Sequence, residues 1–299
     1  MNKLKFLGIL PALMTAFGDD GIDKDKIKQH IKRLAAAGVN GFYVGGSSGE
    51  MVLCSVDERK RLLEASVEAV GELGGQLSVI VHTGAMSTSD ALDLTRHAEK
   101  AGATAVSSVT PLYYKYSFTE IKHYYEQLAN ASKLPVIIYN IPAITGTTLS
   151  HAQLSELLSI DNVGGMKFTS SDFFTLNLLT QEFPDKVFYN GSDEMLLSGL
   201  AAGADGGIGT TYNFIPKHIV GIYKNFRDGN ITRAHELQSR ANKLIDTVVR
   251  LGTLPASKYM INLSGLDYGE CREPFLPLSD EQKSQLNRAW LEVSEYERE

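Results

Sequence analysis

The sequence between residues 164 and 172 reads Gly164-Gly165-Met166-Lys167-Phe168-Thr169-Ser170-Ser171-Asp172. A run that begins at Val163 predicts a buried strand, which ends at Lys167 and Phe168 before a polar turn. An ammonium group at the end of a buried strand loses hydration, which favours the neutral amine. A neutral amine attacks ketones and forms a Schiff base. The alternative is a structural lysine whose stem packs while its charged head reaches water.

Strands of this kind alternate with helices as far as about residue 227, and no linker rich in proline or glycine interrupts them. The expected strands are residues 7–17, 41–44, 77–81, 105–109, 135–141, 163–168, 187–189 and 206–209. Helix starts are marked by Asp23 and by the capping pairs Ser55/Glu58, Ser117/Glu120 and Ser150/Gln153, and Pro216 opens the eighth helix. An open, doubly wound sheet requires the same alternation, but eight strands favour closure. The sequence therefore predicts an α/β fold with a single TIM (β/α)8 barrel over residues 1–229.

The chain continues beyond the residues that the barrel needs. Helical patterns near 231–251, 254–265 and 280–297 predict a C-terminal three-helix extension, residues 230–299, packed on the barrel. At the other end, Met1 to Lys5 and the apolar run that follows are similar to a secretory signal. Pro11 interrupts that run, and cleavage would remove the only strand before the first helix. We therefore expect this segment to belong to the fold.

Composition limits the class of partner. The 299 residues are 43% hydrophobic and 21% charged, as in soluble globular proteins. A net charge of -6 argues against nucleic acid or an anionic membrane as a partner, and no apolar stretch is long enough for a transmembrane helix. The two cysteines, Cys54 and Cys271, lack metal-binding spacing and suggest no disulfide framework. Reduced thiols in a cytoplasmic enzyme are the simplest interpretation.

Polar and glycine-rich groups follow most of the expected strands. In barrels of this type the chemistry lies at the carboxyl ends of the strands. The groups in question are Gly45-Gly46-Ser47-Ser48-Gly49-Glu50, Thr110-Pro111-Leu112-Tyr113-Tyr114, Tyr139-Asn140-Ile141-Pro142, Lys167, Asn190-Gly191-Ser192-Asp193-Glu194 and Gly207-Ile208-Gly209-Thr210-Thr211. This concentration favours a catalytic role for the lysine.

Each group also has a purely structural interpretation. The turn Gly45–Gly49 offers backbone N–H groups and two hydroxyls, which suit a carboxylate or phosphate, but it lacks the lysine of a P-loop and could simply be a tight turn. Tyr139 could relay protons if it lies beside Lys167, or it could be a core residue. Asp193 and Glu194 could bind sugar hydroxyls or stabilise a helix N-terminus.

A metal site fits the sequence poorly. The seven histidines are scattered, and no pair has the spacing of metal ligands on one element. His82, at the end of the third expected strand, is the one candidate ligand, and we interpret it as a hydrogen-bonded structural histidine. We therefore expect neither a metal nor another cofactor.

In this order the six motifs resemble those of the N-acetylneuraminate lyases, which belong to the wider family of Schiff-base pyruvate lyases that includes dihydrodipicolinate synthase. The resemblance covers nearly the whole chain, including the helical tail. It implies an aldolase that reversibly cleaves N-acetylneuraminate into N-acetylmannosamine and pyruvate, and a homotetramer built from dimers.

The resemblance also implies residue roles. Lys167 corresponds to the Schiff-base lysine and Tyr139 to the phenol that relays protons. Ser47 and Ser48 match the pair that holds the pyruvyl carboxylate. Matches to residues that contact the glycerol-like chain and sugar hydroxyls are Thr169, Gly191, Asp193, Glu194 and Thr210.

One further position and two departures from the family pattern bear on the resemblance. Tyr113 matches a tyrosine that reaches across a dimer interface in the family. Ser48 stands where threonine is frequent and Thr210 where serine is frequent, and both keep the hydroxyl, so we expect altered affinity and intact chemistry.

The same comparison separates subfamilies. Synthases that act on aspartate semialdehyde usually carry an arginine where this chain has Ile144, so a bidentate partner for a second carboxylate is missing here. The Asn190–Glu194 segment favours a polyhydroxylated chain instead. Two alternatives remain open: a related pyruvate aldolase acting on a 2-keto-3-deoxy sugar acid, and a non-catalytic sialic-acid sensor.

Overall fold

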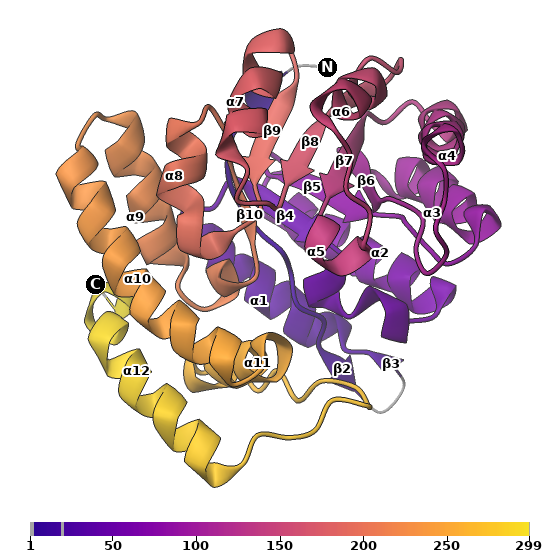
Figure 1. Ribbon diagram of the computed structural model, residues 1–299. Coiled ribbons are helices and arrows are strands. Elements are labelled where there is room, and N and C mark those ends of the chain that lie inside the picture. The colour runs from indigo at the N-terminus through magenta and orange to yellow at the C-terminus, as the bar shows by residue number, and fades with distance from the viewer. Residues whose placement is uncertain (1–2, 19–20, 299) are drawn as a thin grey trace.

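The computed structural model describes residues 3–18 and 21–298, and its centre is a ring of eight parallel strands (Figure 1). The order is β1-β10-β9-β8-β7-β6-β5-β4. A single bridge between Ala12 and Tyr43 joins the two ends of this order, and the Leu13 N–H donates to the Tyr43 carbonyl at 2.8 Å. The bounds are β1 Gly8–Pro11, β4 Gly41–Val44, β5 Ser78–His82, β6 Ala105–Val109, β7 Val136–Asn140, β8 Val163–Phe168, β9 Val187–Asn190 and β10 Gly206–Gly209. The predicted (β/α)8 barrel is confirmed.

Helices connect successive strands and surround the ring. They are α1 Lys24–Ala36, α2 Val56–Glu72, α3 Thr88–Ala101, α4 Phe118–Ala131, α6 His151–Leu158, α7 Phe173–Glu182, α8 Leu196–Ala201 and α9 Pro216–Arg227. Shorter helical turns are η1 Lys3–Phe6, η2 Ser47–Gly49, η3 Met51–Leu53, α5 Pro142–Thr145, η4 Asp193–Met195 and η5 Thr211–Asn213. The capping pairs expected at Ser55, Ser117 and Ser150 form complete capping boxes, which explains why α2, α4 and α6 begin where they do.

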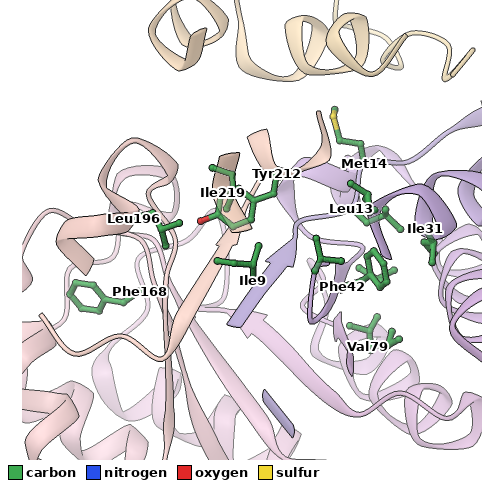
Figure 2. Packing of buried hydrophobic residues seen from close by; sticks show 14 of the residues in the cluster. Ile9, Leu13, Met14, Ile31, Phe42, Val79, Phe168, Leu196, Tyr212 and Ile219 are labelled. Carbon is green, nitrogen blue, oxygen red and sulfur yellow. The ribbon is translucent and has the colours of Figure 1, made fainter. Parts of the chain in front are cut away.

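Strand residues alternate between two apolar clusters, one inside the barrel and one between the strands and the helices. Figure 2 shows members of the outer cluster, among them Ile9, Phe42 and Val79 from three neighbouring strands. Their chain neighbours Leu10, Tyr43 and Ile80 belong to the inner cluster. This alternation follows from the two-residue period of a strand, so a residue's position along its strand decides which side it faces.

The prediction of one long first strand over residues 7–17 is wrong. β1 ends at Pro11, and Phe17–Gly18 (β2) pairs instead with Gly21–Ile22 (β3) as a small antiparallel hairpin. Residues 12–16, between β1 and β2, are largely apolar because they are buried, although they form no strand. Met14, for example, is fully buried, and its carbonyl accepts from the Tyr268 hydroxyl at 2.8 Å. Of the segment considered as a secretory signal, Met1 and Asn2 lie outside the described residues, and the part that follows supplies a barrel strand.

Three helices follow the barrel and lie along one side of it, orange to yellow in Figure 1. They are α10 Ile231–Arg250, α11 Thr253–Leu263 and α12 Asp280–Arg298, within three residues of the predicted bounds. α10 packs against α9 and α12. That residues 230–299 form an extension to a barrel domain of residues 1–229 stays a prediction. Across the parts of the chain that the structure describes, no helix has the length and apolar character of a membrane span.

Glu297, near the end of α12, caps the first turn of α9. Its carboxylate accepts the backbone N–H groups of Lys217 at 3.2 Å and His218 at 2.8 Å, and the side chain is only 7% exposed. We expect Glu297→Ala to lower the free energy of unfolding by about 1–2 kcal/mol, because capping acceptors contribute that much. Urea denaturation of this variant and of Glu292→Ala measures the effect. Glu292 lies on the same helix in an exposed ion pair with Lys243, so an equal loss in both variants would contradict the cap.

Candidate active site

Lys167 lies inside the barrel because its neighbours along β8 lie outside. Met166 and Phe168 belong to the outer cluster, so the two-residue period turns Lys167 inward, and it is only 4% exposed. In the sheet it pairs with Tyr139 on β7 and Tyr189 on β9. Its Nζ lies 4.1 Å from the ring centroid of Tyr139. The amine thus sits in an aromatic, largely dry setting.

A second phenol, that of Tyr43, lies close to the amine, with Lys167 Nζ 4.7 Å from its ring centroid. The Tyr43 hydroxyl donates to Ser107 Oγ at 3.1 Å, and burial raises the pKa of Tyr43 well above its ordinary value. Tyr43 therefore stays protonated. The Tyr139 hydroxyl makes no hydrogen bond to any residue within 3–18 and 21–298, so it is the phenol available to a substrate. Tyr43 is not among the residues predicted for the site, although its position in the strand 41–44 places it on the inner face of the barrel.

His82 packs against Tyr139, with its ring edge-on and the two ring centroids 6.3 Å apart. Its Nε2 accepts the Val109 N–H at 3.1 Å, and Arg59 donates to its carbonyl at 2.8 Å. Burial, followed by the charges of Arg59 and Lys167, lowers the pKa of His82 well below its ordinary value, so the ring is neutral. The geometry agrees with a structural histidine. Among the described side chains, no group of three histidines, cysteines or carboxylates could hold a metal ion.

The turn after β4 brings two hydroxyls to the same end of the barrel. Ser47 and Ser48 open η2, and Ser48 Oγ lies 2.6 Å from Thr210 Oγ1, which follows β10. The Thr15 hydroxyl donates to the Gly49 carbonyl at 2.8 Å and holds the turn from a third segment. Ser48 and Thr210, which are far apart in sequence, thus belong to one hydroxyl pair.

The segments after β8 and β9 meet where the chain has a glycine. A Cβ at Gly191 would overlap with Thr169 Oγ1 and lie 3.2 Å from Lys167 Cε, so only glycine lets these side chains approach. Thr169 Oγ1 is buried and has no hydrogen-bond partner among the described residues. A buried hydroxyl without a partner is costly, which is consistent with a ligand contact there.

Asp193 lies in the helical turn η4, which follows β9. Its Oδ2 accepts the N–H and the hydroxyl of Thr211, both at 2.7 Å, and its Oδ1 lies where a Cβ on Gly209 would be. Burial raises the pKa of Asp193 to about 6, against the lowering effect of the two Thr211 hydrogen bonds. Glu194 is exposed, and its carbonyl accepts from Asn242 of α10 at 3.0 Å.

Tyr113 does not join the cluster within the chain. It is 83% exposed, has a positive φ of 77°, and packs edge-on against Tyr114 with ring centroids 5.0 Å apart. That it contributes to a partner's site stays a prediction. The other predicted residues lie at the carboxyl ends of β4, β7, β8, β9 and β10, at one end of the barrel.

A closed (β/α)8 barrel with a buried lysine against phenols at its catalytic end is the architecture of a lysine-dependent aldolase, a carbon–carbon lyase. The chain belongs to the Dihydrodipicolinate synthetase family, whose sequence model matches residues 5–292.

Relatives and solved structures agree with this assignment. The N-acetylneuraminate lyase of Rhizobium meliloti (strain 1021) is 41% identical over 288 residues, which are 96% of this chain and 95% of the relative. That of Escherichia coli (strain SE11) is 38% identical over 93% of this chain and 94% of its own. The N-acetylneuraminate lyase structure from Fusobacterium nucleatum superposes with a TM-score of 0.89 at 34% identity, covering 97% of this chain and 99% of that one. A catalytic lysine mutant of the Ruminococcus gnavus sialic acid aldolase gives 0.94 at 29% identity, covering 99% and 98%.

Proposed function

We propose that this enzyme catalyses the reversible aldol cleavage of N-acetylneuraminate into N-acetylmannosamine and pyruvate, through a Schiff base on Lys167. The observation that carries the proposal is the place of Lys167: an inward-facing amine, 4% exposed, 4.1 Å from the ring of Tyr139. The relatives named N-acetylneuraminate lyase support the choice of substrate.

In this proposal the amine of Lys167 attacks C2 of the open-chain keto acid, and loss of water gives an iminium ion. The C3–C4 bond then breaks, and its electron pair moves to the iminium nitrogen and leaves an enamine of pyruvate. The C4 hydroxyl loses its proton as C4 becomes the aldehyde of N-acetylmannosamine. Tyr139 relays that proton. Protonation of the enamine at C3 and hydrolysis of the imine release pyruvate and restore the amine.

The remaining predicted residues bind the two ends of the substrate. Ser47 and Ser48 hold the carboxylate with their hydroxyls and the backbone of their turn. The groups assigned to the hydroxylated chain are Thr169, Gly191, Asp193, Glu194 and Thr210. The buried hydroxyl of Thr169, without a partner among the described residues, supports this assignment.

A direct assay tests the function. Purified protein is given N-acetylneuraminate and, separately, 2-keto-3-deoxygluconate, and pyruvate release is followed for both. We expect kcat/KM to be higher for N-acetylneuraminate, as the relatives named N-acetylneuraminate lyase suggest. A preference for the second acid would replace the proposed substrate, and binding without pyruvate release would indicate a sensor.

Asp193 should make substrate binding depend on pH. The pKa of Asp193 is raised to about 6, so its carboxylate becomes protonated as the pH falls through that value. Because Oδ2 already accepts from Thr211, the proton goes to Oδ1 and removes that acceptor. We expect KM for N-acetylneuraminate to rise below about pH 6, and Asp193→Asn to raise KM about tenfold at neutral pH. KM in that variant should be flat between about pH 5 and 8; the same rise below pH 6 in both proteins would exclude Asp193 as its source.

We also propose a homotetramer in the cytoplasm. The exposed pair Tyr113 and Tyr114 supports a subunit contact on that loop, since large aromatic side chains are enriched in interfaces. Cys54 and Cys271 are both free thiols, which suits a reducing compartment. Light scattering after size exclusion measures the mass of the assembly, and a monomeric mass would overturn this part of the proposal.

A further inference from the structure

A buried ion pair links the C-terminal helices to the turn that carries Ser47 and Ser48. Glu50 ends this turn, and its carboxylate lies 2.8 Å from Lys258 Nζ of α11. The two side chains are 0% and 1% exposed. Neither residue belongs to the proposed chemistry. A charge buried to this extent is retained only where it is paired, so the two groups depend on each other.

Both partners of the ion pair make further contacts. Lys258 Nζ donates to the Glu270 carbonyl at 2.7 Å and lies 4.3 Å from the ring centroid of Phe17. The second oxygen of Glu50 accepts the Arg272 N–H at 2.8 Å. The Glu50 carboxylate is therefore held through one oxygen by α11 and through the other by the segment that follows α11.

Arg272 extends this grip to the next element along the chain. Its guanidinium donates to the Leu53 carbonyl at 2.8 Å and to Glu58 Oε2 at 2.9 Å. Leu53 ends the helical turn that follows Glu50, and Glu58 belongs to the capping box that starts α2. The whole segment from the turn to the start of α2 is thus fixed from the C-terminal side.

The backbone of Glu50 shows why an anchor is needed there. Its φ of 57° and ψ of 39° are left-handed, a conformation that non-glycine residues adopt only where their surroundings impose it. In that conformation its N–H donates to the Ser47 carbonyl at 3.1 Å and its carbonyl accepts the Leu53 N–H at 2.9 Å. The side-chain anchor and the shape of the turn are therefore coupled through one residue.

We propose that Glu50 and Lys258 are positioning residues for substrate binding: the buried ion pair holds the Ser47–Ser48 turn in the shape that receives the pyruvyl carboxylate. This inference rests on the proposed function, which assigns that carboxylate to the two serines. It gives the C-terminal helices a role in the reaction, since one of them supplies a group that the active-site turn requires.

The test compares three variants with the wild type. Lys258→Met removes the cation at similar length, and the double variant Glu50→Gln/Lys258→Met removes both charges, so no unpaired charge is left buried. Glu297→Gln is the matched control, because Glu297 of α12 also joins the C-terminal helices to the barrel through buried contacts, but its partners are at the start of α9 and not in the turn. Steady-state kinetics in the condensation direction give separate KM values for pyruvate and N-acetylmannosamine. Amide hydrogen exchange over residues 46–51 reports the order of the turn without any turnover.

We expect Lys258→Met and the double variant to raise KM for pyruvate by about tenfold, with KM for N-acetylmannosamine and kcat changed by less than about threefold. Exchange over residues 46–51 should be faster than in the wild type, whereas Glu297→Gln should lower thermal stability with normal exchange in this segment. A wild-type KM for pyruvate and a wild-type exchange rate in the folded double variant would overturn the inference, even if Lys258→Met alone changed both quantities. If the wild type shows no lyase activity, the proposed function fails, and exchange alone still decides whether the pair orders the turn.

Discussion

Lys167→Ala should abolish both cleavage and covalent trapping of pyruvate. Without the amine no iminium ion forms, and the electron pair of the C3–C4 bond has no acceptor, so we expect kcat/KM to fall by at least about 10⁴-fold. Borohydride reduces the imine of the wild-type protein in the presence of pyruvate. Mass spectrometry of the intact protein should show the addition of one reduced pyruvyl group to the wild type and none to the variant.

A second lysine, Lys186, supplies the control. Lys186 precedes β9, and its Nζ donates to the carbonyl of Val163 at the amino end of β8 at 2.6 Å. Burial lowers the pKa of Lys186. If burial alone made a lysine reactive, Lys186 would compete for pyruvate. We expect Lys186→Ala to keep wild-type trapping, and peptide mapping should place the adduct on Lys167. An adduct that survives in Lys167→Ala would refute the assignment of the nucleophile.

Tyr139→Phe should lose turnover with little loss of binding. The substitution removes only the hydroxyl that relays the C4 proton and keeps the ring packed against the Lys167 amine. General acid–base groups contribute about 10²- to 10⁴-fold, so we expect kcat to fall within that range and KM to change by less than about fivefold. Cleavage of N-acetylneuraminate over a range of concentrations measures both.

Tyr43→Phe is the matched variant for this prediction. Both rings face the amine, but the Tyr43 hydroxyl donates to Ser107, whose own hydroxyl donates to the Ile137 carbonyl at 2.7 Å. Its loss should cost some stability and leave kcat within about tenfold of the wild type. A larger loss of kcat in Tyr43→Phe than in Tyr139→Phe would mean that the relay has been assigned to the wrong phenol.

Most of the fold could be predicted because it rests on local signals. Capping boxes at Ser55, Ser117 and Ser150 mark helix starts through contacts only three residues apart, and strand composition marks the rest. The first strand was predicted too long because burial and strand structure give the same apolar pattern. In residues 12–16 the burial comes from Tyr268 and other distant parts of the chain, which no local pattern reveals.

The candidate site also has a part that the sequence predicts and a part that it does not. That Lys167 points inward follows from the strand period, and the resemblance supplied the roles of its partners. The contact of Ser48 with Thr210 and that of Glu50 with Lys258 join residues at least 160 positions apart, and neither has a sequence signal of its own. The neutral state of His82 likewise depends on its burial and on the charge of Arg59, a residue of α2 that donates to the His82 carbonyl.

The seam of the barrel has a consequence for how the protein is made. β1 forms four register pairs with β10, whereas a single bridge, between Ala12 and Tyr43, joins this part of the chain to β4. The main partner of β1 is therefore synthesised roughly 200 residues later. At ribosomal speed that delay amounts to roughly 10 to 40 s, during which the nascent chain carries an unsatisfied apolar edge. We therefore expect newly made protein to engage chaperones until Gly206–Gly209 has left the ribosome. A circular permutant that begins at Gly206, and so delivers β10 and β1 early, should depend on them less.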